Sequence, residues 1–208
     1  IDKVPLDDIF VQMKLTIIDD DKVNEVVPNI SKFANTQNKV SDSDFFSNDV
    51  YHIRIEEKSR RIWAPIKSGE LKGTKWFYER AKGQYLEVQS KLTDAQKKEF
   101  KATNPKSQMF TKTDLAKYMM VWKNLPHIVS LGAQKNFDKF GEIIVPKWNK
   151  NDKEFNDVYY QHAIAKAIIF KECDSIVYSQ PWYGGYKANI VAYTLSTISY
   201  LLGKEKKN

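Results

Sequence analysis

The stretch "TKTDLAKYMMVWKN" (residues 111–124) is the segment from which the fold follows most directly. Its apolar side chains recur at intervals of three and four residues, which places them on one face of a helix. They are Leu115, Tyr118, Met119 and Trp122. A helix with one apolar face packs that face against a core, so this stretch predicts a helix of a helical domain.

Helical patterns continue on both sides of this stretch. Thr93 and Gln96 have the spacing of a capping box, and Asn104-Pro105 ends the short polar helix that they begin. Pro126 suits the first position of a helix over residues 126–144, because that position needs no backbone N–H. The chain is therefore predicted to be helical from residue 93 onward.

The last part of the sequence predicts two more helices. Residues 155–177 have the composition of a core helix, and residues 186–203 form a second apolar helix that Gly203 closes. Residues 145–152, "VPKWNKND", are predicted as a linker, and residues 180–185, "QPWYGG", as a turn. These connections would separate the helices of the C-terminal part.

Before residue 93 the pattern is mixed. Apolar and polar residues alternate over residues 9–18, which predicts a strand. Residues 75–89 have two aromatic, extended halves around Ala-Lys-Gly and predict a β-hairpin. Residues 41–61 predict one or two short helices, with Ser41-x-x-Asp44 resembling a capping box.

The fold class predicted from these patterns is α+β. A small N-terminal part with a few strands and helices, residues 1–92, is followed by a mostly helical part, residues 93–208. There is no internal repeat and no low-complexity segment in the sequence. We therefore expect one continuous compact unit.

The composition fits a folded, basic protein. Of the 208 residues, 42% are hydrophobic and 13% aromatic, which is enough for a core. The formal net charge of +7 permits a polyanionic partner, but the lysines are dispersed, as on an ordinary solvated surface. Cys173 is the single cysteine, so an internal disulfide is excluded, which fits a reducing cytosol. No segment reaches the ~18 apolar residues of a membrane span.

Several common site motifs are absent from the sequence. It has no GxGxxG, GxxxxGK[ST] or GxSxG motif, and its histidines and cysteine lack metal-ligand spacing, so no cofactor or metal is predicted. Glu56-x-Lys58 has the spacing of a nuclease triad, to which Asp42, Asp44 or Asp49 could add the other acid. The same spacing is common in charged helices, and a solvated helix face is the favoured interpretation.

Two stretches carry candidate site residues. Asn35, Gln37 and Asn38 present donors and acceptors together, as in recognition of a base edge or a peptide group. Their composition alone favours a helix end. The stretch 75–85, "KWFYERAKGQY", interleaves aromatic and basic residues, as segments that bind nucleic acid do, and favours a polar contact for Tyr78 or Arg80.

With these stretches in view, the chain resembles the AIPR family of bacterial abortive infection phage resistance proteins. The resemblance is carried in family order by "FANTQNKVSDSDF" (33–45), "KWFYERAKGQY" (75–85), "TKTDLAKYMMVW" (111–122), "LPHIVSLGAQKNF" (125–137) and "WYGGYKANIVAYT" (182–194). Family members are larger, and some have a nuclease-like region nearer the N-terminus. The resemblance implies that this chain is the C-terminal portion of such a protein.

The resemblance also implies which residues form a site. The residues carried over from the family motifs are Asn35, Gln37, Asn38, Asp44, Tyr78, Glu79 and Arg80, to which the basic stretch adds Lys75. Asp44 is the candidate catalytic residue, and the others are candidates for binding nucleic acid or another ligand.

Three functions are compatible with the sequence. The first is a cytoplasmic antiviral defence protein that acts as a nucleic-acid- or nucleotide-recognition module without a cofactor. In the alternative, the chain completes a nuclease or nucleotide-hydrolase site together with an upstream region, and is inactive by itself. In the second alternative, the helical part is a structural domain that forms a homo-oligomer.

Overall fold

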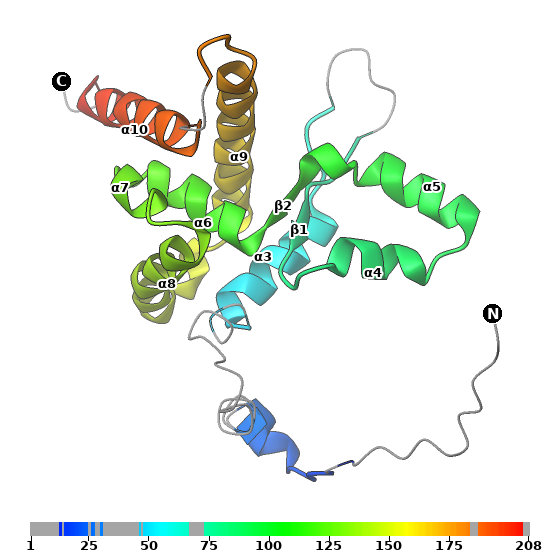
Figure 1. Ribbon diagram of the computed structural model, residues 1–208. Coiled ribbons are helices and arrows are strands. Elements are labelled where there is room, and N and C mark those ends of the chain that lie inside the picture. The colour runs from blue at the N-terminus through cyan, green and yellow to red at the C-terminus, as the bar shows by residue number, and fades with distance from the viewer. Residues whose placement is uncertain are drawn as a thin grey trace. The chain divides into compact units, whose positions relative to one another are not determined.

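The computed structural model in Figure 1 shows a mostly helical protein. It describes residues 13, 15–24, 26–27, 30, 46, 48–66, 73–183 and 187–205. The chain divides into two compact units, residues 1–40 and 41–208. Helices predominate and a two-stranded sheet accompanies them, which confirms the predicted α+β class with mainly helical character.

In the first unit, η1 (Asp20–Lys22) is a short 3-10 helix that leads into α-helical residues. The strand predicted over residues 9–18 is wrong for its described positions, because residues 13 and 15–18 adopt no strand conformation. A strand needs a neighbour to pair its backbone groups. The described residues of this unit contain no second strand, and Leu15 and Ile17 are exposed.

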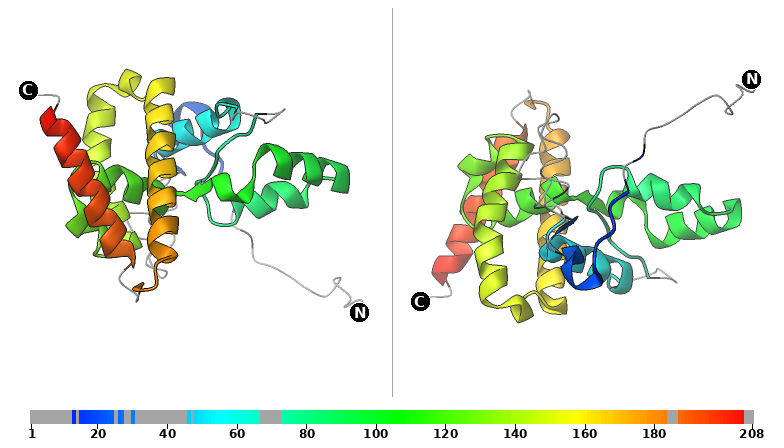
Figure 2. Two further views of the ribbon diagram at one scale, coloured as in Figure 1. Left: turned by 90° about the horizontal axis from the view of Figure 1, so that it is seen from above. Right: turned by 90° about the horizontal axis from the view of Figure 1, so that it is seen from below.

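The second unit contains a small parallel sheet. Strand β1 (Phe77–Glu79) pairs with β2 (Met109–Thr111), with Tyr78 opposite Phe110. Parallel strands require a long crossover connection. Helices α4 (Gln84–Ser90) and α5 (Asp94–Thr103) and the 3-10 helix η2 (Lys106–Gln108) provide it. Figures 1 and 2 show α4 and α5 projecting to one side of the other helices.

The hairpin predicted over residues 75–89 is therefore wrong. Its first half forms β1, but its second half forms α4. The carboxylate of Glu79 accepts hydrogen bonds from the backbone N–H groups of Gly83 and Tyr85, each over 3.1 Å. Gly83 has φ of +84°, a conformation that glycine adopts without strain. These local hydrogen bonds start a helix at the residues that were predicted to form the second strand of the hairpin.

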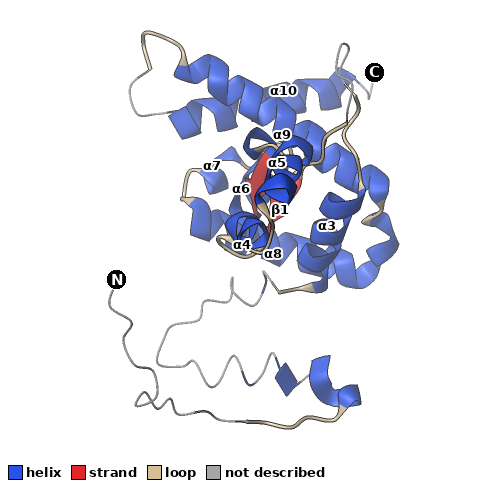
Figure 3. Ribbon diagram, turned by 90° about the vertical axis from the view of Figure 1, so that its right-hand side faces the viewer, coloured by secondary structure: helices blue, strands red, loops and turns tan. Residues whose placement is uncertain are grey.

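The remaining helices of the second unit lie mainly on the side of the sheet away from α4 and α5 (Figure 1), and Figure 3 shows the sheet between them in projection. They are α3 (Val50–Arg61), α6 (Lys112–Val121), α7 (Pro126–Val129), α8 (Ala133–Lys150), α9 (Asp157–Tyr178) and α10 (Lys187–Glu205), with the 3-10 helix η3 (Asp152–Glu154) before α9. Helix α6 contacts α7, α8, α9, α10 and β2. It is thus the element on which α7 to α10 pack.

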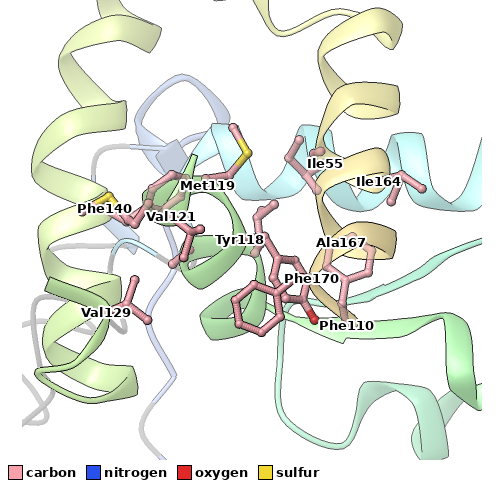
Figure 4. Close-up of a cluster of buried hydrophobic side chains, with 14 of the residues drawn as sticks. Ile55, Phe110, Tyr118, Met119, Val121, Val129, Phe140, Ile164, Ala167 and Phe170 are labelled. Carbon is pink, nitrogen blue, oxygen red and sulfur yellow. The ribbon is translucent and has the colours of Figure 1, made fainter. Parts of the chain in front are cut away.

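The hydrophobic core forms around α6 (Figure 4). Leu115, Tyr118 and Met119 are buried, as predicted from their spacing. They pack in a cluster with side chains from α8 and α9, such as Phe140 and Phe170. The ring centroids of Tyr118 and Phe170 lie 5.0 Å apart. The apolar face of α6, which was predicted from residues 111–124, thus lies at the centre of the core.

The C-terminal helices follow the predictions except at three boundaries. Pro126 is the first residue of α7, as predicted, but Gly132 at φ +101° separates α7 from α8. The linker predicted over residues 145–152 is wrong, because α8 continues through Pro146 to Lys150. Helix α10 likewise continues beyond Gly203 to Glu205. The helix predicted over 155–177 is confirmed as α9.

Tertiary packing explains the longer α8. The ring of Trp148 lies 6.1 Å from the ring of Tyr51 and 5.1 Å from that of Phe155. The guanidinium of Arg54 lies 4.2 Å from the Trp148 ring centroid. These contacts hold the last turns of α8 although Pro146 cannot donate a backbone hydrogen bond within the helix.

Thr111 is the N-cap of α6 and completes a capping box with Asp114. We expect Thr111→Ala to lower the free energy of unfolding by about 1 kcal/mol, because the N–H of Asp114 loses its acceptor. Urea denaturation measures this change. Thr111→Ser keeps the hydroxyl and should retain most of the stability. An equal loss in both variants would contradict the capping role.

Candidate functional site

The carboxyl ends of β1 and β2 meet at one edge of the sheet, because the strands are parallel. Arg80 follows β1 and Lys112 follows β2, so two cationic residues come to this edge. Ligands of open parallel sheets bind at the carboxyl ends of the strands. We therefore take this edge as the candidate functional site and define it by the side chains around it.

A histidine lies at the centre of the site. His52 of α3 is fully buried, and its Nδ1 is 2.5 Å from the hydroxyl of Tyr78 in β1. Burial raises the pKa of Tyr78 well above its ordinary value, so the phenol stays protonated. The direction of its hydrogen bond with Nδ1 depends on the tautomer of the imidazole. The other ring nitrogen, Nε2, is buried and has no hydrogen-bond partner among the described residues.

Aromatic rings enclose the imidazole. The ring centroids of Phe46 and Phe137 lie 4.4 and 5.4 Å from that of His52. The Tyr51 ring lies 4.9 Å away, nearly perpendicular to the imidazole. Such surroundings exclude water and disfavour a charged imidazole. Burial, and then the charges of Lys112 and Arg80, lower the pKa of His52 from 6.5 to about 3.

Asn136 places a second unpaired polar atom in the buried part of this unit. It is buried in the first turn of α8, and within the described residues its Oδ1 has no hydrogen-bond partner. The next residue, Phe137, contacts His52, and its ring centroid lies 5.3 Å from Nζ of Lys112. An unpaired buried polar atom costs about 1–3 kcal/mol. Two buried polar atoms, Nε2 of His52 and Oδ1 of Asn136, are thus retained without a partner among the described residues, at a cost in stability.

Arg80 belongs to a network at the margin of the site. Its Nε donates to Oε2 of Glu56 over 2.6 Å, and its Nη1 donates to Oδ1 of Asn48 over 2.6 Å. Glu56 also accepts hydrogen bonds from Arg60 and Gln84. About a quarter of the Arg80 side chain is exposed, at 24%. The guanidinium is thereby held in place with part of its surface open to solvent.

The other candidates from the family motifs differ in their surroundings. Tyr78 is buried against His52, while Glu79 caps α4. Nζ of Lys75 donates to the carbonyl oxygen of Arg60 over 2.8 Å and lies 4.4 Å from the Trp63 ring centroid. The structure thus brings Tyr78 and Arg80 to the site. Candidates Asn35, Gln37, Asn38 and Asp44 lie outside the described residues.

His52 and Asn136 were not predicted as site residues from the sequence. His52 has no ligand-like spacing to another histidine, and Asn136 sits in an ordinary amphipathic pattern. The available signal was the position of Asn136 beside Phe137 in a stretch that carries the family resemblance. The pairing of His52 with Tyr78 joins residues 26 positions apart and could not be read from local spacing.

The residues with the spacing of a nuclease triad form structural contacts. Oε2 of Glu56 pairs with Arg80, whereas Nζ of Lys58 pairs with Asp157 over 2.6 Å. Asp49 accepts from the backbone N–H of Tyr51 as the N-cap of α3. In the described part of the chain, no group of three or more His, Cys, Asp or Glu residues could hold a metal ion. Likewise, none of the described helices has the length and apolar character to cross a membrane.

A separate hollow lies between α9 and the segment that follows α3. It has a volume of about 530 Å³ and is lined by apolar residues such as Trp76, Ile164 and Ile168 together with polar ones. Gln108 is one of the polar residues, and its Oε1 is a buried acceptor without a partner in the described part of the chain. None of the residues around His52 contributes to this lining.

The fold and site define a mainly helical α+β protein with a buried His–Tyr pair at the end of a parallel sheet. The family model described as AIPR protein matches residues 1–208, so the chain belongs to the AIPR family of abortive infection phage resistance proteins. Comparisons with curated proteins and with solved structures gave no match. The family match does not test whether the chain is a C-terminal portion, which stays a prediction.

The lowered pKa of His52 predicts a pH-dependent stability. Between pH 6.5 and about 3 the unfolded chain binds a proton that the folded chain does not. The free energy of unfolding should therefore fall with decreasing pH, by up to about 1.4 kcal/mol per pH unit from this group. His52→Gln should remove this part of the slope in urea denaturation between pH 7 and 4.5.

His162→Gln is the matched control, because His162 is an exposed residue of α9. It should leave the pH dependence of unfolding close to that of the unchanged protein. Equal slopes for His52→Gln and the unchanged protein would show that His52 does not stay neutral in the fold.

Proposed function

We propose that this AIPR protein contributes to phage resistance by recognising nucleic acid or a nucleotide at the end of its parallel sheet. The observation that carries the proposal is the meeting of three family stretches around His52. The stretch 75–85 contributes Tyr78 and Arg80, 111–122 contributes Lys112, and 125–137 contributes Phe137.

The charges around this edge favour an anionic ligand. The positive charges of Lys112 and Arg80 both contribute to the lowered pKa of His52, after burial, so both act on this edge. Lys82 after β1 and Lys135 in the first turn of α8 are exposed. That turn has no acidic residue and no side-chain cap, and helix N-termini attract phosphate. Phosphate groups could approach these residues from solvent.

In this proposal the amides of Asn35, Gln37 and Asn38 supply specificity for bases, since side-chain amides read base edges by paired hydrogen bonds. Arg80 and the lysines hold phosphate, whereas Tyr78 and Glu79 support the site from within. Lys75, which lies against Trp63, supports the entry to β1. Phosphate contacts give affinity without sequence preference, so the amides carry the selectivity.

Lys135→Glu tests the proposal with Lys150→Glu as its control, because both lysines are exposed at opposite ends of α8. We expect Lys135→Glu to weaken binding of labelled single-stranded DNA or RNA and to reduce the salt-dependence slope by about 1. Lys150→Glu should leave both nearly unchanged. Binding that is absent at low ionic strength would refute the proposal.

An assay of phage protection distinguishes the proposed recognition function from a catalytic function of Asp44. If Asp44→Ala abolishes protection while the protein still folds and binds nucleic acid, the alternative is favoured, in which Asp44 completes a nuclease or nucleotide-hydrolase site with an upstream region. If Asp44→Ala retains protection, that alternative is excluded for Asp44, and recognition remains the proposed function.

A second candidate function is assembly of a homo-oligomer through α10. Val191, Ala192 and Leu195 form its buried face. Apolar side chains are nevertheless exposed along the rest of the helix, namely Tyr193, Ile198, Leu201 and Leu202. Clusters of exposed apolar side chains often mark protein contacts.

Leu201→Glu tests this second function. If α10 forms a contact between copies, the charge should lower the molar mass in light scattering to that of a monomer. Leu86→Glu on α4 is the control, because Leu86 is also exposed, at 67%. A monomer before the substitution would exclude assembly through α10.

A further inference from the structure

The hollow between α9 and the segment that follows α3 continues along α9 into a second hollow. The second has a volume of about 360 Å³, and both are lined by Ala64, Pro65, Trp76, Ile164 and Ile168. Sites for small molecules usually measure ~300–1,000 Å³. The two adjoining hollows, which we call the α9 groove, are therefore large enough for a small organic ligand.

Helical spacing aligns the side chains of α9 along the groove. Ile164, Ile168 and Lys171 recur at intervals of four and three residues, so they lie on one face of the helix. Ile164 is buried, whereas Ile168 is 43% exposed. Two apolar side chains thus lead to an ammonium group, which lines only the larger hollow and marks one end of the groove.

Trp76 gives the groove an apolar wall that is already formed without a ligand. Its side chain is buried, and its ring centroid lies 6.0 Å from that of Phe110. Its carbonyl oxygen accepts a hydrogen bond from the hydroxyl of Tyr160 over 3.3 Å. A wall that is held in this way loses little conformational entropy on binding, which favours affinity for a ligand.

Lys171 places a positive charge at one end of the groove. Its Nζ donates to the carbonyl oxygens of Ser107 and Met109 over 2.7 and 2.8 Å, and it lies 5.2 Å from the ring centroid of Trp76. An ammonium group has three donors, so one is left for a ligand. In the described part of the chain no acid forms an ion pair with Lys171. A negatively charged group would therefore meet a donor whose position is fixed.

Two polar residues of the lining narrow the class of ligand. Glu172 lines the groove and is exposed, so its carboxylate would repel a ligand with a second negative charge. Oε1 of Gln108 is a buried acceptor without a partner among the described residues. An N–H or hydroxyl group of a ligand that reached this amide would satisfy it. The lining thus favours an apolar molecule with one acidic group and one donor.

We propose that the α9 groove binds a small aromatic acid that carries one negative charge. The ring of the ligand lies against Trp76 and Ile168, and its acidic group accepts a hydrogen bond from Lys171. Binding covers the apolar surface that Ile168 exposes to solvent. The groove shares no residue with the site around His52, so this proposal does not depend on the function proposed there.

Fluorescence titration of the whole chain with anilinonaphthalenesulfonate tests the proposal, because this probe has an aromatic body, one negative charge and an N–H donor. Phenylnaphthylamine has the same rings without the charge. Lys171→Met should weaken binding of the sulfonate by about tenfold, the value of one charge-assisted hydrogen bond, and leave binding of the uncharged probe nearly unchanged. A loss of the same size for both probes would show that Lys171 does not hold the acidic group, and would overturn the proposal.

Ile168→Asp and Ile169→Asp provide a matched pair of variants. Both isoleucines are on α9 and 43% exposed, but only Ile168 lines the groove. Ile168→Asp should weaken binding of the sulfonate by more than about tenfold, because the new carboxylate removes an apolar contact and repels the anion. Ile169→Asp should leave it nearly unchanged. Equal affinity of the unchanged protein and Ile168→Asp for the sulfonate, or no binding to the unchanged protein, would overturn the proposal.

Competition in the same assay tests the class of ligand. Naphthoate, an aromatic carboxylate, should displace the sulfonate from the unchanged protein. Inorganic phosphate at the same ionic strength should not, because it lacks an apolar body and Glu172 opposes its second charge. Displacement by phosphate without displacement by naphthoate would assign the groove to a simple anion and overturn the proposal.

Discussion

The parallel pairing of β1 with β2 is the constraint on which the second unit depends. Because the strands run in the same direction, the chain must cross from the end of β1 back to the start of β2. Helices α4 and α5 make that crossing. The same pairing sends Arg80 and Lys112 to one edge of the sheet, where α3 adds His52. A hairpin would have placed the ends of its strands at opposite edges.

The packing at that edge explains why a costly polar centre persists. Aromatic rings from several segments surround His52, so water cannot solvate its Nε2. The hydrogen bond to Tyr78 fixes the orientation of the imidazole. A core optimised only for stability would replace such atoms by apolar groups. Unpaired polar atoms beside cationic residues are more typical of a site that meets a ligand.

Local features were predicted well because their causes are local. The cap at Thr93 and the start of α7 at Pro126 depend on residues within one turn. The extent of α8 was not predictable, because contacts of Trp148 with Tyr51 and Phe155 outweigh the local effect of Pro146. The end of the helix was therefore decided by residues distant in sequence.

The sequence by itself determined the apolar faces of the main helices, the α+β class and the family to which the chain belongs, because periodic spacing and motif order are written along the chain. It also identified Tyr78 and Arg80 as candidates. Only the tertiary structure decided that His52 of α3 meets Tyr78 of β1. The two residues lie on separate elements, and the packing of α3 against β1 brings them together.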